Sequence, residues 1–166
     1  MNPDKRRVEP VREDLPSDND LRVYAGRLLA RREYAVQELH ARLVRKWPEL
    51  AGKEHRVGEL MESLQQEGSL SDRRFAESFI RSRRRRYNGP VKIQSELRQR
   101  LVPDEVIAGL LDVSDDAWVG LASAWLSHQS HEPLDFSARA KYYRRLVNRG
   151  FSHQQAMQAL NSREKA

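Results

Sequence analysis

Residues 73–80 read RRFAESFI, and the spacing of their apolar side chains decides the fold. A large apolar residue is followed by alanine, two variable positions and two further large apolar residues. On a helix of 3.6 residues per turn this spacing forms one continuous buried stripe, and the alanine lets a neighbouring helix approach closely. The stripe comprises Phe75, Ala76, Phe79 and Ile80.

The same spacing occurs twice more, at offsets of about 50 residues, which indicates an internal repeat. The copies are Tyr24, Ala25, Leu28 and Leu29, and Leu121, Ala122, Trp125 and Leu126. Each stripe is followed by a second helix with an apolar pair four residues apart, one turn above the other. The pairs are Leu39 and Leu43, Ile93 and Leu97, and Tyr142 and Leu146. A third helix follows with its own apolar triplet: Val57, Leu60 and Met61; Ile107, Leu110 and Leu111; Ala156, Ala159 and Leu160.

Three helices in each of three repeats predict an all-α fold of about nine helices. Helix-favouring residues dominate, and the alternation typical of strands is absent. Units this small cannot bury their apolar faces alone, so we expect them to stack into an elongated, curved array. The alternative is an ordinary helical bundle whose spacing agrees by coincidence. Agreement of all three helix patterns in the same order favours the array.

The predicted boundaries divide the chain into a flexible charged N-terminal segment (1–20), repeat 1 (21–68), repeat 2 (69–113, basic) and repeat 3 (114–166). Repeat 1 carries an insertion at 47–56, which predicts a longer loop between its second and third helices. The spacing of a capping box occurs at Ser69 with Asp72 and at Ser152 with Gln155. These pairs predict two helix starts.

The composition indicates a cytoplasmic protein. Of the 166 residues, 39% are hydrophobic and 33% are charged, and none is cysteine, which excludes disulfides and thiolate zinc sites. The first 20 residues lack the apolar stretch of a signal peptide, and the longest apolar run, 106–111, is too short to span a bilayer. We expect neither secretion nor membrane insertion.

A search for catalytic motifs finds none. The sequence contains no glycine-rich phosphate loop, no nucleophile elbow and no histidine pair at i, i+4 spacing. His128 and His131 lie one helical turn apart, a spacing that more often marks an ordinary helix end than a metal site. We therefore expect no enzymatic activity, no cofactor and no metal; a metal-dependent nuclease is the least favoured alternative.

The net charge of +6 is concentrated in the middle of the chain. Residues 71–100 contain ten Lys or Arg and three Asp or Glu, a local net charge of +7, so that the remaining residues sum to −1. Four consecutive arginines, 83–86, cover every azimuth of a helix, and several must face solvent. Because the guanidinium fork binds both phosphate and carboxylate, DNA phosphates and an acidic protein surface are both eligible partners.

The candidate binding residues extend from this segment to a second basic run in repeat 3. Solvation alone is the alternative role for such charges, but the acids nearby are few. Tyr143 and Tyr87 are weaker candidates for stacking on unpaired bases, since Tyr142 falls at a core position of the repeat and packing is expected to explain most aromatic residues. We expect salt-sensitive binding without sequence specificity. The candidates are Arg73, Arg74, Arg81, Arg83, Arg84, Arg85, Arg86, Tyr87, Lys92, Arg98, Arg100, Lys141, Arg144 and Arg145.

Repeat 2 resembles the signature of the RecX family, in which glycine, an apolar residue and aspartate precede an Arg-Phe-Ala helix, and a Gly-Pro turn leads into the next helix. The similarity extends through the repeats over about 21–162. This sequence departs from the pattern at Ser69, Ser71 and Leu101, where the family usually has an aromatic residue, an acid and glycine. The matching residues are Gly68, Leu70, Asp72, Arg74, Phe75, Ala76, Phe79, Ile80, Arg83, Gly89, Pro90, Ile93, Glu96 and Leu97.

The resemblance implies a modular all-helical regulator that binds RecA and lies in the groove of RecA–DNA filaments, and we expect the protein to be a monomer. It implies modulation, mainly inhibition, of recombinase, ATPase and co-protease activity in DNA repair, recombination and the SOS response. In this hypothesis the basic repeat meets DNA phosphates or RecA carboxylates while the outer repeats bridge successive subunits. The alternative is a general DNA-binding protein that acts without RecA.

Overall fold

The computed structural model describes residues 15–129 and 134–164, and within these ranges the chain contains α-helices, one short 3-10 helix and no strand. The all-α prediction is confirmed. The elements are α1 (Asp18–Leu29), α2 (Val36–Lys46), the 3-10 helix η1 (Pro48–Leu50), α3 (His55–Gln66), α4 (Asp72–Arg85), α5 (Pro90–Arg98), α6 (Asp104–Ala108), α7 (Ala117–Gln129), α8 (Phe136–Asn148) and α9 (His153–Glu164).

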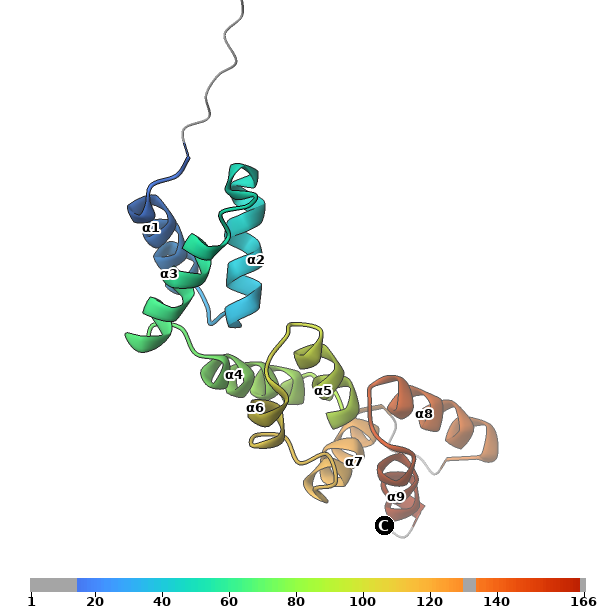
Figure 1. The fold of residues 1–166 in the computed structure, drawn as a ribbon. Coiled ribbons are helices and arrows are strands. Elements are labelled where there is room, and N and C mark those ends of the chain that lie inside the picture. Colours follow the sequence, from blue (N-terminus) through green and yellow to red (C-terminus); the bar gives the residue numbers. More distant parts are fainter. Residues whose placement is uncertain (1–14, 130–133, 165–166) are drawn as a thin grey trace, which may run out of the picture.

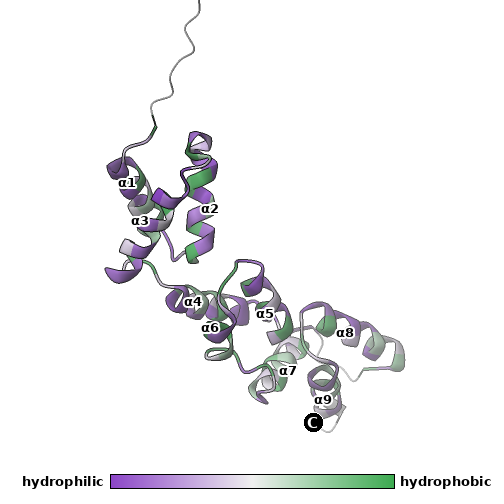
Figure 2. Cartoon of the chain, viewed as in Figure 1, coloured by the Kyte–Doolittle hydropathy of each residue, from purple (hydrophilic) through white to green (hydrophobic). Residues whose placement is uncertain are grey.

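The helices form three successive units, α1 to α3, α4 to α6 and α7 to α9, arranged along an extended and bent path (Figure 1). Figure 2 shows apolar stretches on the helix faces turned toward one another and polar stretches on the outside. The predicted stripes explain this arrangement. Ala25, Ala76 and Ala122 are each fully buried, as the close approach of a neighbouring helix requires.

The buried side chains form two separate cores. One core is formed by α1–α3 together with Leu70, and the other is continuous through α4–α9 and includes Ala35, the residue before α2. The predicted insertion in repeat 1 explains how this repeat closes a core of its own, because η1 contributes Leu50, which is fully buried, and Trp47 packs against the same cluster. Repeats 2 and 3 therefore share one core, which Ala35 of repeat 1 joins, and the other buried residues of repeat 1 form a second core.

Polar contacts join repeat 1 to repeat 2. The N-cap residue of α2 is Ala35, whose side chain cannot accept a hydrogen bond. Instead, Asp72 at the start of α4 accepts a hydrogen bond from the backbone N–H of Val36 at 2.9 Å. Beside it, Arg74 pairs with Glu33 at 3.1 Å. A residue of repeat 2 thus supplies the missing cap of a helix in repeat 1.

Replacing Asp72 tests this cap between repeats. We expect Asp72→Ala to lower the free energy of unfolding by about 1 kcal/mol, the usual contribution of an N-cap, whereas Asp72→Asn keeps an acceptor oxygen and costs less.

Burial raises the pKa of the Asp72 carboxyl, against the opposing hydrogen bond from Val36. The folded state therefore holds this proton more tightly than the unfolded chain. Stability from this group should fall as pH rises above the unfolded pKa of about 3.9, and Asp72→Asn should remove that dependence in urea titrations. An unchanged pH profile in Asp72→Asn would contradict this assignment.

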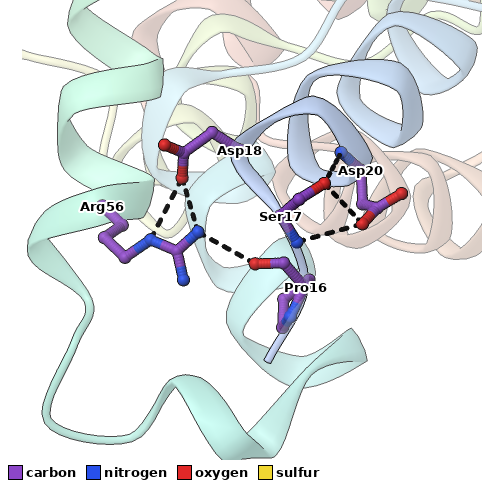
Figure 3. A network of polar contacts seen from close by, with 5 residues as sticks. All are labelled: Pro16, Ser17, Asp18, Asp20 and Arg56. Carbon is purple, nitrogen blue, oxygen red and sulfur yellow. Dashed lines mark hydrogen bonds and ion pairs between the residues drawn. The ribbon is translucent and has the colours of Figure 1, made fainter. Parts of the chain in front are cut away.

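The predicted N-terminal segment 1–20 is too long, because α1 already begins at Asp18. Ser17 and Asp20 form a capping box: the Ser17 hydroxyl accepts from the Asp20 N–H at 3.1 Å, and the Asp20 carboxylate accepts from the Ser17 N–H at 3.0 Å (Figure 3). Arg56 on α3 pairs with Asp18 and donates to the carbonyl of Pro16 at 2.9 Å. Residues 1–14 lie outside the described residues.

The two predicted capping boxes have different outcomes. Ser152 and Gln155 exchange the expected hydrogen bonds at 2.9 and 3.1 Å, which confirms the start of α9. The prediction for Ser69 is wrong by two residues, since the N-cap of α4 is Ser71, whose hydroxyl accepts from the Arg74 N–H at 3.3 Å. Ser71 is the cap because an N-cap residue must directly precede the first helical residue, which is Asp72.

Leu101 ends α5 in the left-handed conformation that glycine normally adopts, with a φ of 57°. The side chain is 66% exposed, so its packing offers little to offset the strain. We expect Leu101→Gly to raise the free energy of unfolding by up to about 1 kcal/mol and the Tm by about 2–4 °C. Leu101→Ala, which keeps the Cβ, is the matched control and should give no such gain in a thermal melt.

Candidate cationic binding surface

Internal ion pairs neutralise four of the predicted arginines. Arg73 pairs with Glu77 at 3.1 Å, and Arg74 pairs with Glu33 across the first junction between repeats. Arg98 pairs with Asp104 at 2.7 Å. The pairs formed by Arg73 and Arg98 are exposed and contribute little stability.

The fourth pair is structural. Arg83 on α4 and Glu96 on α5 are both largely buried and meet at 2.6 Å, while the Arg83 guanidinium lies 4.6 Å from the centre of the Phe79 ring. Arg100 covers the same ring at 4.8 Å and donates to the carbonyl of Glu96 at 2.8 Å. These two arginines therefore hold α4 against α5, and they are poorly placed to bind a partner.

The unneutralised arginines lie in the second half of α4 and just beyond its end. Arg81, Arg85 and Arg86 are exposed, and their side chains form no ion pair within the described part of the chain. Arg84 packs over the ring of Trp118 on α7 at 4.5 Å, with no carboxylate partner among the described residues. Cations at this end of a helix are favoured by the helix dipole. The free cluster in repeat 2 is smaller than the sequence predicted.

The second basic run lies on α8. Lys141, Arg144 and Arg145 are exposed there, and Arg139 contacts Asn161 on α9. Residues 136–150 contain five Lys or Arg and no Asp or Glu. The fifth, Arg149, was missed by the sequence analysis, although this acid-free run was a signal that could have found it.

A close contact between two glycine turns brings the two basic regions together. The Gly89 N–H donates to the carbonyl of Arg149 at 2.7 Å, and the Val91 N–H donates to the carbonyl of Gly150 at 3.0 Å. A Cβ on Gly89 would lie 2.3 Å from the backbone of Gly150, so only glycine fits. The turn after α4 is thereby fixed against the turn after α8.

A cleft of about 430 Å³ lies at this junction between repeats 2 and 3. Three of its described lining residues are cations and three are amides, and none of them is a carboxylate. Of these residues, only Lys92 and Arg145 were among the predicted site residues. The lining residues are Asn88, Lys92, Trp125, Gln129, Arg145, Asn148 and Arg149.

The two candidate tyrosines are engaged in packing. Tyr87 contacts His128 edge-on, with 5.5 Å between ring centres, and packs against the shared core of repeats 2 and 3. The Tyr143 hydroxyl lies 2.8 Å from Nδ1 of His153. Both rings therefore have intramolecular partners, and base stacking draws no support from their placement.

Neither a metal site nor a membrane span is present among the described residues. There, no group of three or more His, Cys, Asp or Glu is placed to hold a metal ion. None of the helices in the same ranges is long and apolar enough to cross a membrane. His131 lies outside the described residues.

The fold and the surface together define a class: a modular array of three-helix units with a cationic face across its second and third repeats. Comparison with known proteins narrows this class. The family model for "RecX, second three-helix domain" matches residues 71–111, within the predicted repeat 2. The chain belongs to the RecX family of regulatory proteins.

Relatives and solved structures agree with this assignment. The chain is 40% identical to the regulatory protein RecX of Chromohalobacter salexigens, over 82% of this chain and 88% of that protein. It is 39% identical to the regulatory protein RecX of Halorhodospira halophila, over 81% and 83%. The fold is similar to the crystal structure of RecX from Lactobacillus salivarius, with a TM-score of 0.74 at 18% identity over 90% of this chain and 97% of that one.

Proposed function

We propose that this protein binds RecA and RecA–DNA filaments in the cytoplasm and modulates, mainly inhibits, their recombinase, ATPase and co-protease activities. Membership of a family of regulatory proteins supports a regulatory role. The proposal gives the chain no chemistry of its own. RecA performs the hydrolysis, and this chain alters it by occupying or destabilising the filament.

The observation that carries the proposal is the meeting of two acid-free cationic segments at the junction of repeats 2 and 3. Residues 81–95 contain six Lys or Arg and no acid, and residues 136–150 contain five and no acid. The glycine turns join these two segments where the turn after α4 meets the turn after α8. A surface of this charge attracts a polyanionic assembly and speeds its encounter.

An apolar floor within the arginine cluster supports a protein partner in addition to DNA. Ile80 and Leu110 line a cavity of about 390 Å³ together with Arg81, Arg84 and Arg85, and with Glu77, the partner of Arg73. Arginine around an apolar centre is a common composition of protein interfaces. An extended array that touches several RecA subunits would combine weak contacts through effective concentration.

A filament ATPase titration tests the proposal. The variant Arg81→Gln, Arg85→Gln, Arg86→Gln removes three exposed charges that have no internal ion pair. The control Arg27→Gln, Arg31→Gln, Arg45→Gln removes three exposed charges of repeat 1 for which no ion pair is found among the described residues. We expect wild type and control to suppress ATP hydrolysis by preformed filaments, and the test variant to need about tenfold more protein, or about 1.4 kcal/mol.

The same titration separates the filament regulator from a general DNA-binding protein. A regulator suppresses hydrolysis when present well below stoichiometry with the DNA sites. A protein that only coats DNA must saturate the DNA first, and competitor DNA should remove its effect. Equal potency of the test variant and wild type would remove the α4 arginines from the site.

A further inference from the structure

The cleft between repeats 2 and 3 is built by helices whose positions the glycine contact fixes. Asn88 and Lys92 come from the start of α5 and the turn before it, whereas Arg145, Asn148 and Arg149 come from the end of α8. The backbone of Gly150 abuts the stem of Lys92 so closely that a Cβ there would lie 2.2 Å from the Lys92 Cβ. The cations of both repeats therefore converge without a flexible linker between them.

Arg149 is held in place before any ligand arrives. Its Nη1 donates to the carbonyl of Arg86 at 3.0 Å and to that of Tyr87 at 3.4 Å. The guanidinium covers the ring of Trp125 at 4.7 Å. These partners are neutral, so the full charge remains, and the Nε and Nη2 donors have no hydrogen-bond partner in the described ranges. A cation fixed in this way loses little conformational entropy on binding an anion.

Lys92 also lacks an internal counter-ion within the described residues. The acid one helical turn further along α5 is Glu96, the usual i, i+4 partner. Glu96 is already engaged by Arg83 at 2.6 Å, which leaves Lys92 unneutralised. Arg145, the third cation, is exposed and lies 5.8 Å from the centre of the Tyr142 ring. The cleft thus gathers three positive charges, and its lining, as far as the structure describes it, holds no carboxylate.

The chemistry of the lining favours phosphate groups in series. One carboxylate needs one guanidinium fork, whereas three cations beside three amides suit several non-bridging oxygens at once. Other exposed cations flank the cleft. Arg86 lies at the end of α4, and Lys141 and Arg144 lie on α8. Trp125 is only 4% exposed beneath Arg149, so its ring is closed to a base.

We infer that this cleft is a binding site for the phosphodiester backbone of nucleic acid, which it engages without reading bases. The inference rests on the proposed function and extends it: DNA phosphates, and not RecA carboxylates, occupy the junction of repeats 2 and 3. The Lys92, Arg145 and Arg149 cations neutralise adjacent phosphates, and Asn88, Gln129 and Asn148 donate to their oxygens.

Binding to DNA in the absence of RecA tests this inference. The double variant Lys92→Gln, Arg145→Gln removes two cations of the cleft, while the control Arg27→Gln, Arg31→Gln removes two exposed charges of repeat 1 that have no ion pair among the described residues. Fluorescence anisotropy with labelled oligothymidylate and with a mixed-sequence duplex measures affinity against salt. We expect the cleft variant to lose about tenfold in affinity and to reduce the salt slope by about 1.5, as two lost phosphate contacts predict. The control in repeat 1 should stay within about twofold of wild type, because its two charges lie outside the cleft and the cations that flank it.

The single charge reversal Lys92→Glu provides a second variant at an exposed position and should weaken DNA binding further. Equal losses in the cleft and control variants, or wild-type DNA binding by the cleft variant, would overturn the inference. If the cleft variant binds DNA normally but fails to inhibit filament ATPase, the cleft meets RecA, and only the proposed function stands. If it loses DNA binding but still inhibits filaments, the cleft site stands, and filament inhibition depends on contacts elsewhere.

Discussion

Gly89→Ala is expected to lower the free energy of unfolding by about 3–5 kcal/mol, combining a steric clash with the loss of two hydrogen bonds. The new Cβ would lie 2.3 Å from backbone atoms of Gly150 and Phe151, and backbone cannot move aside as a side-chain tip can. The two turns must separate, which stretches the bonds from the Gly89 and Val91 amides. Thermal unfolding followed by circular dichroism should show a Tm about 10 °C lower.

Gly120→Ala is the matched control for this prediction. A Cβ on Gly120 within α7 would meet no atom within 4 Å, so alanine should stabilise the helix by about 0.5–1 kcal/mol. Hydrogen exchange should also localise the effect of Gly89→Ala. Because repeats 2 and 3 share one core, protection should fall throughout α4–α9 and persist in α1–α3. Wild-type stability in Gly89→Ala would contradict the close contact of the turns.

Trp118→Ala is the second substitution with a large expected effect, a loss of about 3–5 kcal/mol. The Trp118 side chain is only 2% exposed, and its Nε1 donates to the carbonyl of Asp112 at 2.7 Å. It joins the loop after α6 to α7 and carries the guanidinium of Arg84 on its ring. Truncation opens a large cavity and leaves the Asp112 carbonyl without this donor, and urea unfolding measures the combined cost.

Trp118→Phe separates packing from the hydrogen bond. Phenylalanine fills most of the cavity but cannot donate, so we expect a smaller loss, about 1–2 kcal/mol. Both variants keep every cation of the cleft between repeats 2 and 3. The Phe variant should therefore bind oligothymidylate like wild type, and a large loss of DNA affinity would show that Arg84 needs its aromatic support in order to bind.

Most of the fold could be predicted because its signal is local. The stripe in 73–80 and its two copies identify helices whose buried faces the structure confirms, among them fully buried Ala76 and Ala122. Periodicity could not reveal that repeat 1 closes its own core, since that depends on Leu50 in an insertion. The start of α1 was missed because Ser17 and Asp20 lie in a stretch rich in prolines and charges.

The site was less predictable because charge neutralisation depends on tertiary contacts. Arg83 and Glu96 are 13 residues apart, and Arg74 and Glu33 are 41 apart, beyond the reach of helical spacing rules. The sequence predicts the same binding role for Arg83 and Arg85. In the structure Arg83 is paired with Glu96, whereas Arg85 is exposed. Arg149 acquires its role only through a contact with a turn more than 60 residues earlier.

The cap that Asp72 places on α2 has a consequence for synthesis on the ribosome. Domains form from the N-terminus as the chain emerges, and α2 leaves the exit tunnel well before its cap does. Until residue 72 has emerged, the Val36 amide lacks the acceptor that it has in the finished protein. The first helical unit therefore gains its final stabilising contact only as the second begins to appear, so that its maturation is timed by translation of its neighbour.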